Sequence, residues 1–118
     1  MAAPNIVNVA TITGKSVTGA LGTSTATLLQ NSASSNKVFK INTILVSNVD
    51  GTNSATAAIS LYDGTDRYIA KGITVPAGAT VVLIDKNSSL YLEENKIIRG
   101  DASAASDLEY IISYEEIS

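Results

Sequence analysis

Hydrophobic and polar residues alternate along most of the chain with a period of two, which is typical of β-strands. Turn-forming residues interrupt this alternation about every ten to twelve residues, as in all-β sandwiches and barrels. The pattern therefore predicts an all-β fold: an antiparallel β-sandwich, jelly-roll or immunoglobulin-like, with about eight strands. The strand-like segments are residues 5–13, 26–30, 38–49, 54–62, 67–75, 80–85, 90–92, 96–102 and 108–117.

The clearest single feature is residues 37–64, which predict a β-hairpin closed by the turn Val-Asp-Gly-Thr-Asn. Asp50 and Gly51 are expected to supply positive φ angles where the chain reverses. Apolar side chains occupy both faces of the first strand, with Phe39, Ile41, Leu45 and Val49 on one face and Val38, Ile44 and Val46 on the other. We therefore expect a central strand that is covered on both sides.

Two later segments also indicate their position in a sheet. Residues 80–85 are apolar at both parities, which predicts an interior strand. The last strand, residues 108–117, places Tyr110 and Tyr114 on the same face as its apolar residues, so we expect both tyrosines in the core or at its edge. Between the predicted strands 67–75 and 80–85, Pro76 and Gly78 predict a turn with a positive φ at the glycine.

In the first segment, residues 5–13, neither face would be purely apolar. Ile6 and Ile12 share one parity, whereas Val7 and Val9 share the other. Two interpretations remain open: an ordinary first or edge strand, or an extended N-terminal arm that lies across a neighbouring subunit. The arm would comprise residues 1–13 of a chain that otherwise forms one domain over residues 1–118.

Composition excludes several classes of activity. The chain of 118 residues has no cysteine and no histidine, which removes Ser-His-Asp and Cys-His catalysis, nearly all zinc sites and haem ligation. With a net charge of −3 and eight scattered basic residues, it lacks the basic cluster that nucleic-acid binding requires. We expect neither an enzyme nor a nucleic-acid-binding protein.

Targeting signals do not change this interpretation. The first residues, MAAPNIVNVATITG, lack the basic region and continuous apolar run of a signal peptide. No stretch approaches the roughly 20 apolar residues of a membrane-spanning helix. We expect a soluble protein that is made in a cytoplasm and does not bind membranes.

Short motifs in the chain have simpler structural explanations. Arg99-Gly100-Asp101 matches an adhesion tripeptide, but it falls inside a predicted strand, where Gly100 suits a bulge or a strand end. Loop aspartates could gather around calcium, although turn geometry explains them equally well. The neighbouring Glu93 and Glu94 would point to opposite sides of an extended chain, unlike a glycosidase pair. The sequence therefore predicts no cofactor and no metal.

Tyr62 and Tyr68 are the tyrosines placed outside the predicted core. Each falls on the parity opposite the apolar residues of its strand. A tyrosine combines an apolar ring with a polar tip, which suits a contact surface or a sugar-stacking platform. Both are candidate interface residues.

Several turn and strand motifs together resemble small virion structural proteins of marine tailed bacteriophages, particularly cyanophages. The resemblance covers nearly the whole chain. Its motifs are residues 39–42 running into 46–53, residues 68–71 and 75–80, residues 90–94, and residues 104–118 ending in SYEEIS.

The resemblance implies a non-enzymatic building block of a phage particle, most specifically a capsid decoration or cement protein. Such a protein would bind the major capsid protein or other virion proteins, often as a homo-oligomer with a trimer favoured, on a capsid assembled in the host cytoplasm. It would use edge strands and an extended terminus for these contacts. A tail, neck or fibre component and a carbohydrate-binding receptor-recognition module are the alternatives.

The candidate interface follows from the arm and the two outlying tyrosines, with the loops at residues 31–36 and 50–54 as secondary contacts. Its residues are Ala2, Ala3, Pro4, Asn5, Ile6, Val7, Val9, Ile12, Tyr62 and Tyr68.

Overall fold

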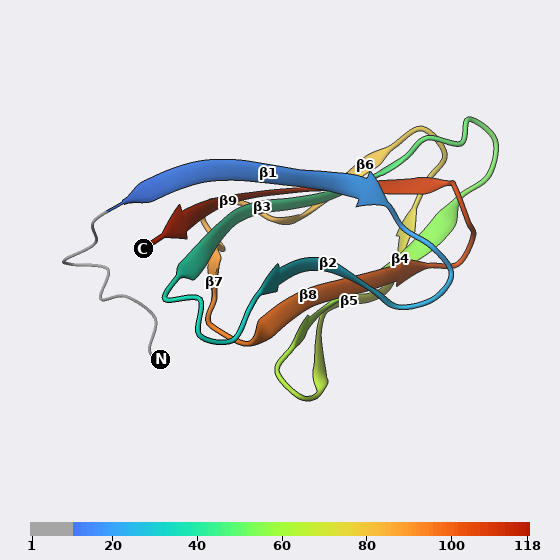
Figure 1. The fold of residues 1–118 in the computed structure, drawn as a ribbon. Helices are drawn as coiled ribbons and strands as arrows, with labels where there is room; N and C mark the ends of the chain where they lie inside the picture. Colours follow the sequence, from blue (N-terminus) through green and yellow to red (C-terminus); the bar gives the residue numbers. More distant parts are fainter. Residues whose placement is uncertain (1–10) are drawn as a thin grey trace.

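The computed structural model describes residues 11–118, which form two antiparallel sheets packed face to face (Figure 1). Sheet A has the strand order β1-β9-β3-β6, with β7 also paired to β3, and sheet B has the order β2-β8-β4-β5. The strands are β1 (Ile12–Ala20), β2 (Ala26–Asn31), β3 (Val38–Asn48), β4 (Ala55–Tyr62), β5 (Asp66–Val75), β6 (Thr80–Ile84), β7 (Leu90–Leu92), β8 (Lys96–Ala102) and β9 (Leu108–Ile117). The predicted all-β antiparallel sandwich is confirmed, with nine strands in residues 11–118.

The connections between strands identify the type of sandwich. The chain crosses from one sheet to the other after β1, β2, β3, β5, β7 and β8. Within the described residues, β4 and β5 are the only consecutive strands that pair with each other. A five-stranded and a four-stranded sheet linked in this way form a jelly roll rather than an immunoglobulin-like sandwich.

The hairpin predicted over residues 37–64 is wrong. β3 lies in sheet A and β4 lies in sheet B, so the two strands face each other across the core instead of pairing. Ile44 on β3 and Ile59 on β4 are both fully buried, and each sheet supplies its apolar face to the same interior. Packed sheets lie about 10 Å apart, a gap that the six residues between these strands can span.

A β-bulge changes the predicted faces of β3. The register with β9 shifts between Ile41 and Thr43, so Ile41 and Ile44 both point into the core although they differ in parity. Val46 is also fully buried, whereas Leu45 lies on the outer face. Most apolar residues of both parities therefore point into the core, whereas Leu45 on the outer face is only partly buried. The expected cover on both sides of this strand is not present within the described residues.

Two other predicted strand positions differ from the structure. β6 lies at the edge of sheet A, not in its interior, and Val82 on this strand is exposed. The first described strand is β1, which pairs along its length with β9 from Ile12 opposite Ile117 to Ala20 opposite Glu109. The sequence missed residues 14–20 because an edge strand on a sandwich needs few inward apolar side chains, and β1 supplies only Val17 to the core.

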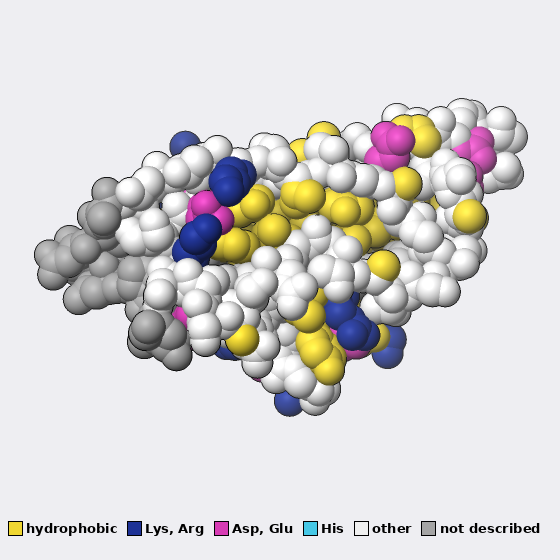
Figure 2. Space-filling view, viewed as in Figure 1, with side chains coloured by type: hydrophobic (Ala, Val, Ile, Leu, Met, Phe, Trp, Pro, Cys, Tyr) yellow, Lys and Arg dark blue, Asp and Glu magenta, His cyan; other side chains and the backbone are white. Residues whose placement is uncertain are grey.

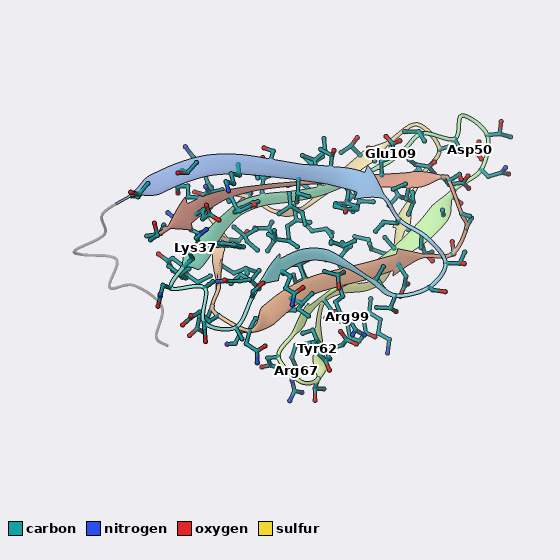
Figure 3. All side chains as sticks on the ribbon, in the orientation of Figure 1. Lys37, Asp50, Tyr62, Arg67, Arg99 and Glu109 are labelled. Carbon is teal, nitrogen blue, oxygen red and sulfur yellow. The ribbon has the colours of Figure 1, made fainter. Side chains whose placement is uncertain are left out.

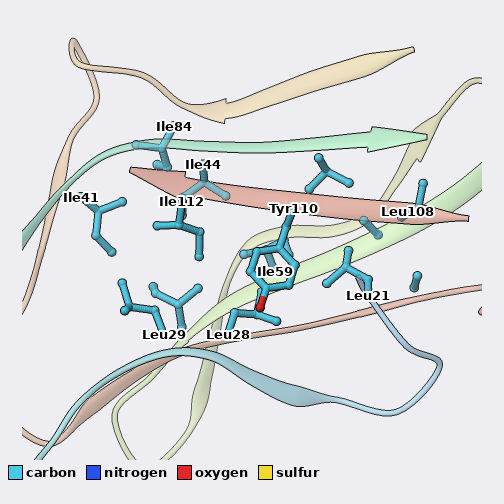
Figure 4. Close-up of a cluster of buried hydrophobic side chains, with 14 of the residues drawn as sticks. Leu21, Leu28, Leu29, Ile41, Ile44, Ile59, Ile84, Leu108, Tyr110 and Ile112 are labelled. Carbon is cyan, nitrogen blue, oxygen red and sulfur yellow. The ribbon is translucent and has the colours of Figure 1, made fainter. Parts of the chain in front are cut away.

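The core is formed by aliphatic side chains from both sheets (Figure 4). Ile44 and Ile112 of sheet A and Ile59 and Ile98 of sheet B are each fully buried. Burying one such side chain contributes roughly 1.5–3 kcal/mol. The predicted core positions of Tyr110 and Tyr114 are confirmed, since Tyr110 is buried and the ring of Tyr114 packs at 5.0 Å from that of Phe39.

Two buried asparagines connect the sheets at opposite ends of the sandwich. At the end of β2, Asn31 Nδ2 donates to the carbonyl oxygens of Lys37 and Leu92, each at 2.9 Å. At the end of β3, Asn48 Nδ2 donates to the carbonyl of Asn53 at 2.9 Å and to that of Val75, across the core, at 3.0 Å. A buried amide group without a hydrogen-bond partner lowers the stability of the folded state, and these hydrogen bonds avoid that cost for both asparagines.

The turns partly follow their predicted chemistry. Gly78 has φ of 70° and Ala79 N donates to the Pro76 carbonyl, as expected for that turn. Gly51 is not among the described residues with positive φ, contrary to the prediction. Instead, the Asp50 carboxylate shapes this connection by accepting a hydrogen bond from Thr52 N at 2.8 Å.

Candidate interaction surfaces

An apolar row crosses the outer face of sheet A. In the strand register, Leu45 on β3 lies opposite both Ile111 on β9 and Val82 on β6. Directly opposed side chains on one sheet face lie about 4.5–5.5 Å apart, so these three form a continuous stripe, called here the outer row. Ile111 is 39% exposed and Val82 is 56% exposed. The outer row thus presents apolar surface to solvent.

A shallow, open depression lies beside the outer row. Its volume is about 370 Å³, and it is lined by Thr18, Gly19, Ala20, Ser47, Glu109, Tyr110 and Ile111. The side chains in its lining are mostly small, and Glu109 (labelled in Figure 3) is its only acidic group. Such a depression can receive a side chain of a partner, whereas it offers no pair of groups for acid–base chemistry.

The outer face of sheet B carries a charged cluster in which Arg99 forms an ion pair within the chain, while its buried Nε has no hydrogen-bond partner among the described residues. Arg99 Nη2 lies 2.9 Å from Asp66 Oδ2, and the guanidinium carbon lies 4.4 Å from the centroid of the Tyr62 ring (Figure 3). Ser60 Oγ donates to Asp66 Oδ1 at 2.8 Å. This cation–π and ion-pair network holds Arg99 in place.

Tyr62 and Tyr68 lie on the outer face of sheet B, on the side predicted from their parity. Tyr62 is half-buried beneath Arg99, and Tyr68 is 50% exposed with the Lys71 amine 4.9 Å from its ring centroid. A cation therefore already occupies one face of each ring. Sugar stacking needs a free aromatic face, so the arrangement of Tyr62 in particular favours a structural role.

Most of the predicted arm cannot be placed. Ala2, Ala3, Pro4, Asn5, Ile6, Val7 and Val9 lie outside the described residues. Ile12 belongs to β1, lies opposite Ile117 and is 55% exposed. The part of the first segment that is described, residues 12–13, therefore forms the start of an edge strand of the chain's own sheet.

The side of the sandwich bordered by β1 and β2 exposes part of the core. Both strands lie at sheet edges, and Figure 2 shows a band of hydrophobic side chains in the opening between them. Inward-facing apolar side chains along this side include Val17 on β1, Leu28 on β2 and Tyr114 on β9, of which Val17 and Tyr114 are only partly buried. We call this feature the β1–β2 opening.

An ion-pair cluster lies at one end of the β1–β2 opening. Glu116 lies 2.9 Å from Lys15 Nζ and 3.2 Å from Lys37 Nζ (labelled in Figure 3). The hydrogen bond from Lys15, assisted by Lys37, lowers the pKa of the Glu116 carboxyl below its ordinary value against the opposing effect of burial. The same contact raises the pKa of Lys15.

The remaining sequence motifs are structural. Arg99-Gly100-Asp101 lies within β8, as predicted, but Gly100 is neither a bulge nor a strand end. It is small because a Cβ there would lie 2.7 Å from Ile59 Cδ1. Asn31, the first residue of the predicted contact loop 31–36, is fully buried and cannot contact a partner. Within residues 11–118, no three acidic residues gather as a metal site would require, and no helix could span a membrane.

The sequence alone missed the outer row and the two buried asparagines. A signal for Ile111 was present, since it interrupts the polar face of its strand between Glu109 and Ser113. Its alignment with Leu45 and Val82 depends on the register of three strands, which the sequence does not contain.

Comparison with known proteins identifies the fold. No protein-family profile and no curated protein matches the chain in sequence. Among solved structures, a chain of the acid-stable capsid of Helicobacter pylori bacteriophage KHP30 is similar, with a TM-score of 0.52 and 10% identity over 94% of this chain and 90% of that one. A chain of the Bacillus endospore appendages, a family of disulfide-linked pili, is also similar, with a TM-score of 0.50 and 12% identity over 91% of this chain and 87% of that one. Both are structural proteins, and both share this chain's fold over nearly its full length.

Proposed function

We propose that this protein is a non-enzymatic structural subunit of a phage virion, most specifically a capsid decoration or cement protein. In this role it binds the major capsid protein on the outside of the head and stabilises the shell. The observation that carries the proposal is the likeness of 94% of the chain to a phage capsid chain. Jelly rolls are common in viral capsid domains, which agrees with this role.

The exposed surfaces supply a physical reason for assembly. The outer row leaves Ile111 and Val82 in water, although apolar area gains free energy when a partner covers it. On the outer face of sheet B, in contrast, Arg99 and Asp66 form an ion pair, and Asp66 also accepts a hydrogen bond from Ser60. Sheet A is therefore the face that we assign to the major capsid protein, and a homotrimer is the favoured form.

Particle composition tests the proposal. Particles of the virus that encodes the chain are purified, the copies of the protein per particle are counted by mass spectrometry, and its density is located in a reconstruction. A cement protein is expected in about hundreds of copies over the head, because icosahedral shells repeat each binding site. Purified particles without the protein would overturn the proposal.

A tail, neck or fibre component is the second candidate, and the likeness to a pilus subunit favours it. The same sandwich would then stack along an axis instead of covering a shell. Copy number separates the two roles, since about tens of copies or fewer are expected for a tail or neck component.

A carbohydrate-binding module is the third candidate and depends on Tyr62 and Tyr68. Alanine replacement of both tyrosines would abolish glycan binding if their rings form the platform. Binding that survives this double replacement on a glycan array would remove the candidate.

A further inference from the structure

The free edge of β1 adjoins an uncovered part of the core. One side of β1 pairs with β9, and no described strand pairs with the other side. Next to this edge lies the β1–β2 opening with its band of hydrophobic side chains (Figure 2). Val17 and Tyr114 are only partly buried there. An unpaired strand edge beside apolar surface is the arrangement that accepts an additional strand.

The chain itself contains a segment of suitable length. Ten residues precede Thr11, and in extended form they span about 33 Å. β1 has nine residues, which span about 30 Å. A single such segment can therefore pair along the whole free edge.

The first described residue, Thr11, is paired with the last residue of the chain. Thr11 N donates to the Ser118 carbonyl at 3.1 Å, and Ser118 N donates to the Thr11 carbonyl at 2.9 Å. This pair of hydrogen bonds continues the β1–β9 ladder, so Thr11 lies at the end of sheet A. Pairing with the same chain's β1 would require an immediate reversal at this point, and the segment contains no glycine to ease it.

The side chains of the segment match the opening. Val7 and Val9 have the same parity, so in a strand they point to one face, about 6.6 Å apart. Asn8 between them points to the opposite face, and the only proline, Pro4, lies near the start of the segment. One face of the segment can therefore be apolar where the opening needs cover.

We infer that residues 2–10 of one copy pair with the free edge of β1 in a second copy, with Val7 and Val9 over the β1–β2 opening. The segment adds a sixth strand to sheet A of its neighbour. This contact is heterologous, so repeated contacts form a closed ring or an open filament. The inference deepens the proposed assembly role by naming a second copy of the chain as a partner.

The first experiment measures self-association of the full chain by analytical ultracentrifugation over a concentration series. The variant Val7→Asp/Val9→Asp is expected to raise the dissociation constant about 100-fold, because two apolar side chains no longer become buried. Ile6→Asp is the matched control in the arm, since its side chain faces away, and a change under about threefold is expected. Val82→Asp on the outer row is the control for packing through sheet A, and it should leave self-association unchanged.

A mixing experiment tests donor and acceptor separately. Val17→Asp damages the acceptor but keeps the arm, whereas Val7→Asp/Val9→Asp damages the arm but keeps the acceptor. Each variant alone is expected to be monomeric, and an equimolar mixture should form one-to-one dimers. Circular dichroism establishes that the Val17→Asp variant is folded.

Disulfide trapping provides a test that does not rely on Val17→Asp. The chain has no cysteine, so Val9→Cys and Lys15→Cys or Val17→Cys introduce defined pairs. A covalent dimer between a Val9→Cys chain and an acceptor-cysteine chain supports the inference, with Val9→Cys and Val82→Cys as the pair that should not react. A disulfide formed only within one chain carrying both cysteines would overturn it, as would a wild-type protein that stays monomeric at about millimolar concentration.

The two proposals can fail separately. Particle composition tests the virion role without reference to the arm. Solution association tests the arm, whatever particle contains the protein.

Discussion

The outer faces of the two sheets differ in how their side chains are paired within the chain. On sheet B, Arg99 pairs with Asp66 and lies over the Tyr62 ring, so its charge has a partner within the chain, although its buried Nε has no hydrogen-bond partner among the described residues. On sheet A, Ile111 and Val82 continue an apolar row that nothing in the described chain covers. The same alternating pattern thus produces one outer face on which Arg99 is paired within the chain and one outer face with exposed apolar area. This difference indicates which face has surface to offer a partner.

The largest expected effect separates the two faces of one strand. Ile112→Ala should destabilise the domain by about 2–5 kcal/mol, because it leaves a cavity in a fully buried site. Its neighbour Ile111 lies on the outer row, and Ile111→Ala should cost less than about 1 kcal/mol. Urea unfolding monitored by circular dichroism measures both values. Equal losses for the two variants would show that sheet A is covered on its outer face even in the isolated chain.

The next effect compares the crowded centre of sheet B with the open edge of sheet A. A Cβ added at Gly100 would lie 2.7 Å from Ile59 Cδ1 and 3.0 Å from the Ala58 carbonyl oxygen, whereas one added at Gly14 meets nothing within 4 Å. Gly100→Ala should therefore cost about 1–3 kcal/mol. Gly14→Ala should be neutral or stabilise by about 0.5 kcal/mol. Thermal unfolding compares the two, and a neutral Gly100→Ala would contradict the close packing of β4 on β8.

A smaller effect tests how much the contacts of Arg99 on the outer face of sheet B contribute to stability. Arg99→Ala removes one partly buried ion pair and one cation–π contact and should cost about 1 kcal/mol. Lys71→Ala, which removes the exposed contact with Tyr68, is the control and should cost under about 0.5 kcal/mol. If the Arg99 variant unfolded at the same urea concentration as the wild type, the network would contribute nothing to stability.

The smallest effect depends on pH at the ion-pair cluster beside the β1–β2 opening. The pKa of Glu116 in the folded protein lies below its ordinary value of 4.5, so the folded state binds fewer protons than the unfolded state. The resulting stabilisation is complete above pH 4.5 and is lost as the pH falls through the lowered pKa. Glu116→Gln should therefore lose less thermal stability than the wild type as the pH falls from about 5 through the lowered pKa of Glu116. Melting temperatures measured across this range by circular dichroism check the difference.

Removal of the partner provides the control for this pH effect. Lys15→Met should flatten the pH profile in the same direction, because the hydrogen bond from Lys15 is the main cause of the lowered pKa. Parallel profiles for the wild type and both variants would show that the cluster does not contribute.

The predicted and observed strands agree best where the local sequence of a strand shows a clear apolar–polar alternation. In β9, Leu108, Tyr110, Ile112 and Tyr114 share one parity, and Tyr110 and Ile112 were placed correctly in the core. In β1, only Val17 packs against the core, and the strand exists because β9 offers it a continuous ladder of partners. A partner distant in sequence leaves no local pattern, so the prediction ended this strand too early.

The sequence by itself determined the fold class, the turn at Pro76 and the absence of thiol and imidazole chemistry, because each of these depends on residue type and local period. Only the tertiary structure decided that β3 and β4 belong to different sheets, that a bulge after Ile41 turns two parities toward one core, and that Val82 ends up exposed at an edge. Strand pairing and register are set by packing between distant segments, where the burial of a whole face outweighs the preference of any single turn.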